Sequence, residues 1–270
     1  MNTNLKLNIN DLRRIYSEDT LFGILEERKK FTNYLWHVAL PKSGSTWLTA
    51  ILGNLFASRN VPTGQLVPDH GERSHEIDPR LFITTEKEVF FKQQHCPYSN
   101  YTNKLVSLTG TKIIFQYRVV EDALASLVDH FESGLFEENP VRQGIPKAVW
   151  HLDREDLKDY VIDIELPWYC KFLSGWITSD LSTSKYFCTV NYDDLNASPL
   201  DTVLYLSDAL NLGFSEKEAH AAIVLSSKVN TRLNIAMPGR GEYFFTESQK
   251  EKIIKCLHYF NLDDKISNLV

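Results

Sequence analysis

The chain has 270 residues, of which 43% are hydrophobic and 24% charged, so it has the composition of a globular protein with a sizeable core. Its formal net charge of −6 argues against a general affinity for nucleic acid or for an anionic membrane, because both partners attract a basic surface. An anionic ligand would therefore need a local pocket.

Further features indicate a single cytoplasmic domain. The N-terminal segment lacks the apolar run of a signal peptide, and no later run reaches transmembrane length, so we expect no membrane association. The four cysteines stand singly, which predicts reduced thiols rather than a disulfide framework or a zinc ribbon. No repeat or linker divides the chain, and we expect one domain over residues 1–270.

Strands alternate with helices along the sequence. The apolar run 34–40 predicts a buried strand, and Trp47, Ile51 and Leu55 then recur at helical spacing. Two more strand-to-helix units follow, and Thr246 and Gln249 have the spacing of a capping box at the start of a last helix. The later elements are expected at 112–117 and 186–191 for strands, and at 121–133, 199–210 and 247–260 for helices. This order predicts an α/β fold with a mainly parallel central sheet flanked by helices.

The turn between the first strand and its helix suits an anion. Residues 42–46 read Lys-Ser-Gly-Ser-Thr, so unpaired N–H groups, hydroxyls and one ammonium can face the same ligand. None of the 12 glycines is followed by lysine, which disfavours the phosphate loop of an ATP-dependent kinase. No G-x-G-x-x-G follows a strand, which disfavours a dinucleotide dehydrogenase. A simple polar helix cap is the plainer alternative.

The segment 41–47, PKSGSTW, resembles the 5′-phosphosulfate loop of the sulfotransferase family, usually written PKSGTTW. The resemblance implies the P-loop-like sulfotransferase fold and 3′-phosphoadenosine 5′-phosphosulfate (PAPS) as the donor. It also implies that this loop binds the donor. The residues concerned are Lys42, Ser43, Gly44, Ser45, Thr46 and Trp47.

Arg118, Asp122 and Ser126 repeat a second signature of that family, R-x-x-x-D-x-x-x-S, after another predicted strand. The resemblance implies that Arg118 and Ser126 hold the 3′-phosphate. Val119 and Val120 replace the usual Asn-Pro, which departs from the pattern without removing a charged ligand. Taken alone, an arginine at a strand end is more often a surface ion pair.

Two looser matches complete the expected donor site. Tyr192 opens a YDDL segment similar to the family's Y-E-D-L/M, in which the tyrosine touches the adenine, and Trp47 would be the other adenine contact. The segment 238–243 stands where the family has R-K-G-x-x-G-x-W, and it supplies Arg240 and Gly241 as 3′-phosphate ligands. A plain Pro-Gly turn is the alternative for this segment.

Lys42, His95 and Ser126 form the expected catalytic set. Lys42 is placed to contact the leaving oxygen, where negative charge develops. His95 matches the histidine of the family segment K-T-H-L-P, which implies that it is the general base. A sulfuryl group carries little charge, so no metal is required. A polar cluster at 69–78, with His70 and His75, fits no metal motif and is expected to be a solvated loop.

We expect a small-molecule acceptor, which residues 62–104 and 131–167 would bind. These segments contain aromatic residues such as Phe82, Phe90 and Phe91, together with several acids, and this combination favours a cationic natural product such as a guanidinium alkaloid toxin. Similar enzymes sulfate such secondary metabolites in cyanobacteria. The alternatives are a nucleotide-dependent small-molecule kinase and a catalytically silent nucleotide-binding module. The acids considered in and beside these segments are Asp129, Glu132, Glu137 and Glu138.

Overall fold

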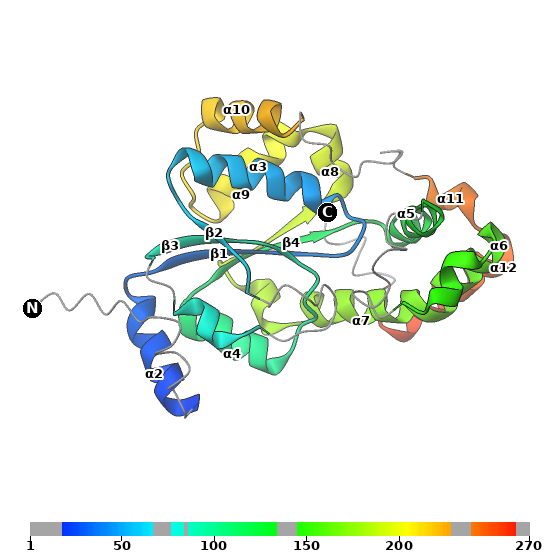
Figure 1. Ribbon diagram of the computed structural model, residues 1–270, viewed down its shortest axis with the longest axis horizontal. Coiled ribbons are helices and arrows are strands. Elements are labelled where there is room, and N and C mark those ends of the chain that lie inside the picture. Colours follow the sequence, from blue (N-terminus) through cyan, green and yellow to red (C-terminus); the bar gives the residue numbers. More distant parts are fainter. Residues whose placement is uncertain (1–17, 67–76, 84–85, 134–144, 228–238, 263–270) are drawn as a thin grey trace, which may run out of the picture.

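A computed structural model describes residues 18–66, 77–83, 86–133, 145–227 and 239–262 (Figure 1). At its centre is a parallel sheet of five strands in the order β2-β3-β1-β4-β5. The fold predicted from the sequence is thereby confirmed. The strands are β1 (Asn33–Ala39), β2 (Thr63–Gly64), β3 (Glu88–Gln94), β4 (Lys112–Tyr117) and β5 (Phe187–Asn191).

Helices cover both faces of the sheet, and a further group lies beyond its carboxyl edge (Figure 1). One face carries α3 (Ser45–Ser58), α8 (Tyr192–Ala197), α9 (Pro199–Ala209) and α10 (Glu216–Ser226). The opposite face carries α2 (Glu18–Lys29), α4 (Asn100–Thr109) and α7 (Leu166–Ile177). The third group consists of α5 (Val120–Glu132), α6 (Arg154–Tyr160), α11 (Gly241–Phe244) and α12 (Glu247–Tyr259).

The alternation of side chains along the strands produces two hydrophobic clusters. Tyr34, Trp36 and Val38 of β1 join the larger cluster with α4, α5 and α7, while Leu35 joins the smaller one with α3, α9 and α10. His37 lies on the same face as Leu35 and is fully buried, although its side chain is polar. Each face of the sheet is therefore sealed by its own layer of helices.

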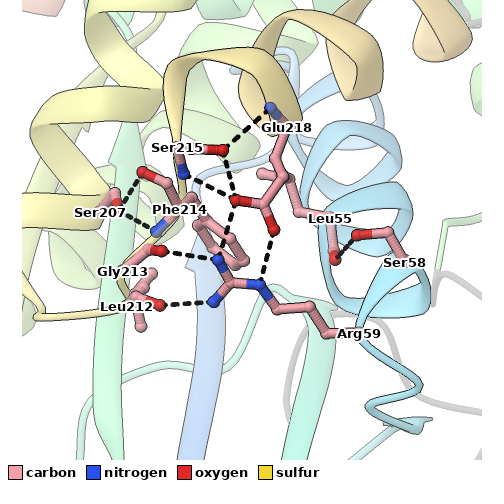
Figure 2. Close-up of polar contacts among 9 residues, drawn as sticks. All are labelled: Leu55, Ser58, Arg59, Ser207, Leu212, Gly213, Phe214, Ser215 and Glu218. Atoms are coloured by element: carbon pink, nitrogen blue, oxygen red, sulfur yellow. Dashed lines mark hydrogen bonds and ion pairs between the residues drawn. The ribbon is translucent and has the colours of Figure 1, made fainter.

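The C-terminal end of α3 is fixed to the loop that leads into α10 (Figure 2). The Arg59 guanidinium donates to the carbonyl groups of Leu212 and Gly213 at 2.8 and 2.6 Å, and it pairs with the Glu218 carboxylate at 2.9 Å. Glu218 also accepts from the backbone N–H of Ser215 at the start of α10. These bonds anchor the C-terminal end of α3. Its N-terminal end lies at the candidate site described below.

The cysteines and the remaining helices add two observations. All four cysteines are free thiols, as expected, and the Sγ atoms of Cys170 and Cys256 lie 3.7 Å apart where α7 meets α12.

Among the described helices, none combines the length and the apolar character needed to cross a bilayer. The short helical turns are η1 (Pro79–Phe82), η3 (Lys147–His151), η4 (Val161–Glu165) and η5 (Asp180–Thr183).

Candidate active site

The turn after β1 is held in an unusual backbone conformation. Lys42 has φ +65° and Gly44 has φ +74°, so both residues adopt the left-handed region, which costs a lysine about 1–3 kcal/mol. Three hydrogen bonds around Ser43 stabilise this conformation. Its N–H and Oγ donate to the Leu40 carbonyl at 3.3 and 2.6 Å, and its carbonyl accepts from Gln116 Nε2 at 2.6 Å. The loop is therefore hydrogen-bonded to the end of β1 through Leu40 and to β4 through Gln116.

The N-terminus of α3 presents donors to this loop. Gly44 is the N-cap residue, and no side chain caps the helix. A helix start leaves its first N–H groups without intrahelical partners, and these groups carry the positive end of the helix dipole. The segment is therefore not the self-capped helix start that was the plainer alternative, and its geometry suits an anion.

Tyr192 and Arg118 lie against the loop from two other strand ends. A Cβ atom on residue 44 would lie 2.5 Å from Cδ2 of Tyr192, so only glycine allows this ring to contact the loop. The Arg118 guanidinium stacks on the same Tyr192 ring, with its central carbon 4.3 Å from the ring centre. Both side chains are buried, and burial raises the pKa of Tyr192. The structure thus brings Lys42, Arg118 and Tyr192 together at one sheet edge, as expected.

Asp122 connects this edge to the loop before α11. Its carboxylate accepts from the N–H of Gly241 at 2.6 Å and from the N–H of Gly239 at 2.8 Å, and it lies 3.5 Å from Arg118. Gly239 has φ +74°, and a Cβ on Gly241 would lie 2.4 Å from Glu121 Cβ, so both glycines are required by this contact. The register of the loop is therefore defined in the structure: it rests on the first turn of α5.

Arg240 pairs with Asp129 on α5. Its two terminal nitrogens contact the two oxygens of the Asp129 carboxylate, one of them at 2.8 Å, and its guanidinium lies 4.9 Å from the Phe244 ring. Arg154 also pairs with Asp129, at 3.3 Å, and with Glu132. In this conformation Arg240 fixes the loop, so its expected role as a phosphate ligand stays a prediction that requires the pair with Asp129 to open.

His95 lies directly after β3 and is oriented by the strand beside it. Its Nδ1 is 2.6 Å from the carbonyl oxygen of Ala39, three residues before Lys42. A carbonyl can only accept, so Nδ1 carries the proton, and the neutral ring has its lone pair on Nε2. The next carbonyl, of Cys96, accepts from the Trp176 indole at 2.9 Å. This geometry holds one tautomer, the one that a general base needs.

Other expected residues differ in how closely they approach this centre. Ser126 is half-buried on α5, one turn beyond Asp122. Trp47 is half-buried against the smaller cluster. Phe82, Phe90 and Phe91, expected to line an acceptor pocket, are instead fully buried in the core, Phe90 stacked on Phe56 at 5.2 Å between ring centres.

The polar cluster at 69–78 lies almost entirely outside the described residues. Asp78 is described, and its carboxylate is bound by Arg80 at 2.6 Å. Within the described ranges, no group of three or more His, Cys, Asp or Glu side chains could hold a metal ion.

Two functional features were not predicted from the sequence. The Asp122 carboxylate was recognised only as part of a signature, and the structure shows that it binds the 239–241 loop. His37 bonds to Gln116, and Gln116 bonds to the loop 41–46. In the sequence, each is only a polar residue within a run that otherwise predicts a buried strand.

Comparisons with known proteins agree with this arrangement. The sulfotransferase domain family matches residues 33–257. The chain therefore belongs to the sulfotransferase family. No curated protein sequence matches it.

Solved structures of low sequence identity share the fold. A mouse sulfotransferase complexed with PAP superimposes with a TM-score of 0.61 at 13% identity, covering 93% of this chain and 92% of its own. Retinol dehydratase in complex with androsterone and the inactive cofactor PAP gives a TM-score of 0.54 at 9% identity, covering 90% and 86%. A complex of retinol dehydratase with retinol and PAP gives 0.52 at 10% identity, covering 86% and 82%.

Proposed function

We propose that this sulfotransferase transfers the sulfuryl group of PAPS to a hydroxyl or amine of a small molecule. The observation that carries the proposal is the convergence of three segments at one sheet edge: the loop 41–46, the Arg118–Tyr192 stack, and the 239–241 loop held by Asp122. A donor with phosphates at both ends of one nucleoside needs two separate anion sites, and this edge offers both. The structural relatives complexed with PAP, the product of PAPS, support the same donor.

We assign the tasks of donor binding, leaving-group stabilisation and proton removal to residues of this site. The helix start and Lys42 would hold the 5′-phosphosulfate, and the Lys42 ammonium would stabilise the charge that develops on the leaving phosphate oxygen. His95 would take the acceptor proton on Nε2, because Nδ1–H is engaged by Ala39. The acceptor oxygen or nitrogen forms a bond to sulfur as the bond from sulfur to the phosphate oxygen breaks, and PAP leaves.

Arg118 and Ser126 would complete the donor site at the 3′-phosphate. Arg118 is buried beside Asp122 at the point where β4 passes into α5, and Ser126 follows on the same helix. A buried guanidinium is suited to a phosphate because it can donate two parallel hydrogen bonds. Tyr192 and Trp47 would contact the adenine.

The acceptor is proposed only as a small molecule. The expectation of a guanidinium alkaloid rested on aromatic residues together with several acids. Of these acids, Asp129 is paired with two arginines and Glu132 with Arg154 in the structure. Glu137 and Glu138 lie outside the described residues. A cationic acceptor thus remains a hypothesis for an acceptor screen, and cytoplasmic location remains a prediction for cell fractionation.

The experiment that tests this function is an acceptor screen with radiosulfur-labelled PAPS. The panel should contain phenols and steroids, aliphatic amines, and guanidinium compounds. We expect label to move to at least one class without added metal, in step with PAP release. ATP with magnesium serves as the second donor: phosphate transfer from ATP would support the kinase alternative, and PAP binding without any transfer would support a silent binding module.

A further inference from the structure

A series of hydrogen-bonded polar side chains lies beneath the loop 41–46, between the sheet and α3. His37 on β1 is fully buried, and its ring nitrogens contact Thr49 Oγ1 on α3 and Gln116 Oε1 on β4, both at 2.9 Å. Gln116, also fully buried, donates from Nε2 to the Ser43 carbonyl at 2.6 Å. The Thr49 hydroxyl in turn donates to Gln93 Oε1 on β3 at 3.0 Å.

The proton positions in this series of side chains follow from the contact between Gln116 and the Ser43 carbonyl. A carbonyl can only accept, so the nitrogen of the Gln116 amide faces Ser43 and its oxygen faces His37. His37 must then donate from Nε2, and its unprotonated Nδ1 lies 2.9 Å from Thr49 Oγ1. Burial lowers the pKa of His37 to about 3, so the ring is neutral and keeps this single tautomer at physiological pH. The donor and the acceptor are thereby defined for the bond from His37 to Gln116 and for the bond from Gln116 to Ser43.

The bond from Gln116 to Ser43 sets the orientation of one peptide group. In a trans peptide the C=O and the next N–H point in opposite directions. Because Gln116 draws the Ser43 carbonyl toward the sheet, the N–H of Gly44 is directed away from the sheet, on the side where the anion would lie. The same bond helps to stabilise the left-handed conformation of the neighbouring Lys42.

We propose that His37 and Gln116 are positioning residues of the donor loop, which orient the Gly44 N–H and the Lys42 backbone for the 5′-phosphosulfate. This inference rests on the proposed function. Ile114 and Leu35 occupy neighbouring positions on the same face and are apolar, as packing against α3 requires. Two buried polar side chains here cost desolvation that an apolar pair would avoid. His37 bonds to Gln116, and Gln116 bonds to the Ser43 carbonyl, so this pair of hydrogen bonds ends at the loop.

Three variants test the proposal. Gln116→Met keeps the volume of the side chain and removes the bond to Ser43, but it leaves the His37 N–H without its acceptor. The double variant His37→Leu/Gln116→Met removes that buried donor as well, so it should recover stability while still lacking the bond to the loop. Thr109→Val is the matched control, because it removes a buried hydroxyl that bonds to Leu105 at the end of α4.

Calorimetric titration with PAP and steady-state kinetics give the readouts. We expect both Gln116 variants to bind PAP at least about tenfold more weakly and to raise KM for PAPS, with KM for the acceptor unchanged. Thr109→Val should unfold at a lower temperature yet bind PAP as the wild type does. If the double variant folds and binds PAP within about twofold of the wild type, the positioning role is wrong. If the wild type itself does not bind PAP, the proposed function fails and this inference fails with it.

Discussion

Replacing Gly241 by alanine tests the contact between the 239–241 loop and α5. The new Cβ would lie 2.4 Å from Glu121 Cβ, 2.6 Å from the Glu121 carbonyl carbon and 2.8 Å from the Asp122 nitrogen, and the last two atoms are backbone. Ordinary contact begins near 3.4 Å, so the loop must withdraw by about 1 Å. That shift breaks the 2.6 Å bond from Gly241 to Asp122 and strains the bond from Gly239.

The cost can be estimated from these bonds. A hydrogen bond to a charged group contributes about 1.5–3 kcal/mol, so the closed loop should lose about 2–3 kcal/mol. If binding of the 3′-phosphate needs the 239–241 loop in contact with α5, PAP affinity falls by up to about 30- to 160-fold, because only the fraction of molecules with this contact binds. Calorimetric titration measures this loss, and the circular dichroism spectrum checks that the fold is intact.

Gly53→Ala provides the matched control. Gly53 lies within α3, and a Cβ there would have nothing within 4 Å. This variant should bind PAP like the wild type and gain about 0.5–1 kcal/mol of stability from helix propensity. A Gly241→Ala protein with wild-type PAP affinity would refute the reasoning, since it would show that the loop does not contribute to donor binding in the conformation described.

Three other predictions concern the catalytic residues and stability. Lys42→Ala should lower kcat far more than PAP affinity, and equal losses in both would contradict a role at the leaving oxygen. His95→Asn should abolish most turnover while PAP binding persists, and normal turnover would remove His95 as the base. Hydrogen bonds from Arg59 lower the pKa of Glu218 from 4.5 to about 2 in the folded state, so this carboxylate stabilises the fold above about pH 4.5 and loses that contribution as the pH falls toward 2. The difference in unfolding temperature between the wild type and Glu218→Gln should therefore shrink from pH 7 to about pH 3, and a constant difference would contradict the assignment.

The strand-to-helix units at the site could be predicted because their signals are local. The strand expected at 112–117 is observed at Lys112–Tyr117, and the capping box from Thr246 to Gln249 opens α12 as expected. Helix α3 begins at Ser45, two residues before Trp47, where the predicted apolar repeat starts, because its N-cap is the left-handed Gly44. Hydrophobic periodicity therefore located the elements, while the caps fixed their ends.

Long-range packing explains what could not be predicted. Phe90 and Phe91 lie in β3, whose neighbours are far away in the chain, so the sequence did not distinguish a core strand from a pocket wall. The contacts of Asp122 with Gly239 and Gly241 join residues more than a hundred positions apart, and neither end carries a local signal for the other. The bond from Gln116 to Ser43 joins residues 73 positions apart, and it has no local signal in the sequence either.

The pair formed by Arg240 and Asp129 shows a further limit of motif reading. The sequence placed an arginine and a glycine in the loop, but it did not show that the arginine is already bound by a carboxylate on α5. A motif identifies residue types, whereas the charge available to a ligand depends on their partners.

A calorimetric titration with PAP, compared with ATP under the same conditions, tests the central claim most directly. The site combines the helix start at the loop 41–46 with the buried Arg118 guanidinium, and the proposed function assigns one phosphate of the nucleotide to each. We expect PAP to bind at least about 100-fold more tightly than ATP, with no requirement for magnesium. Equal affinity for the two nucleotides, or a preference for ATP, would contradict the account.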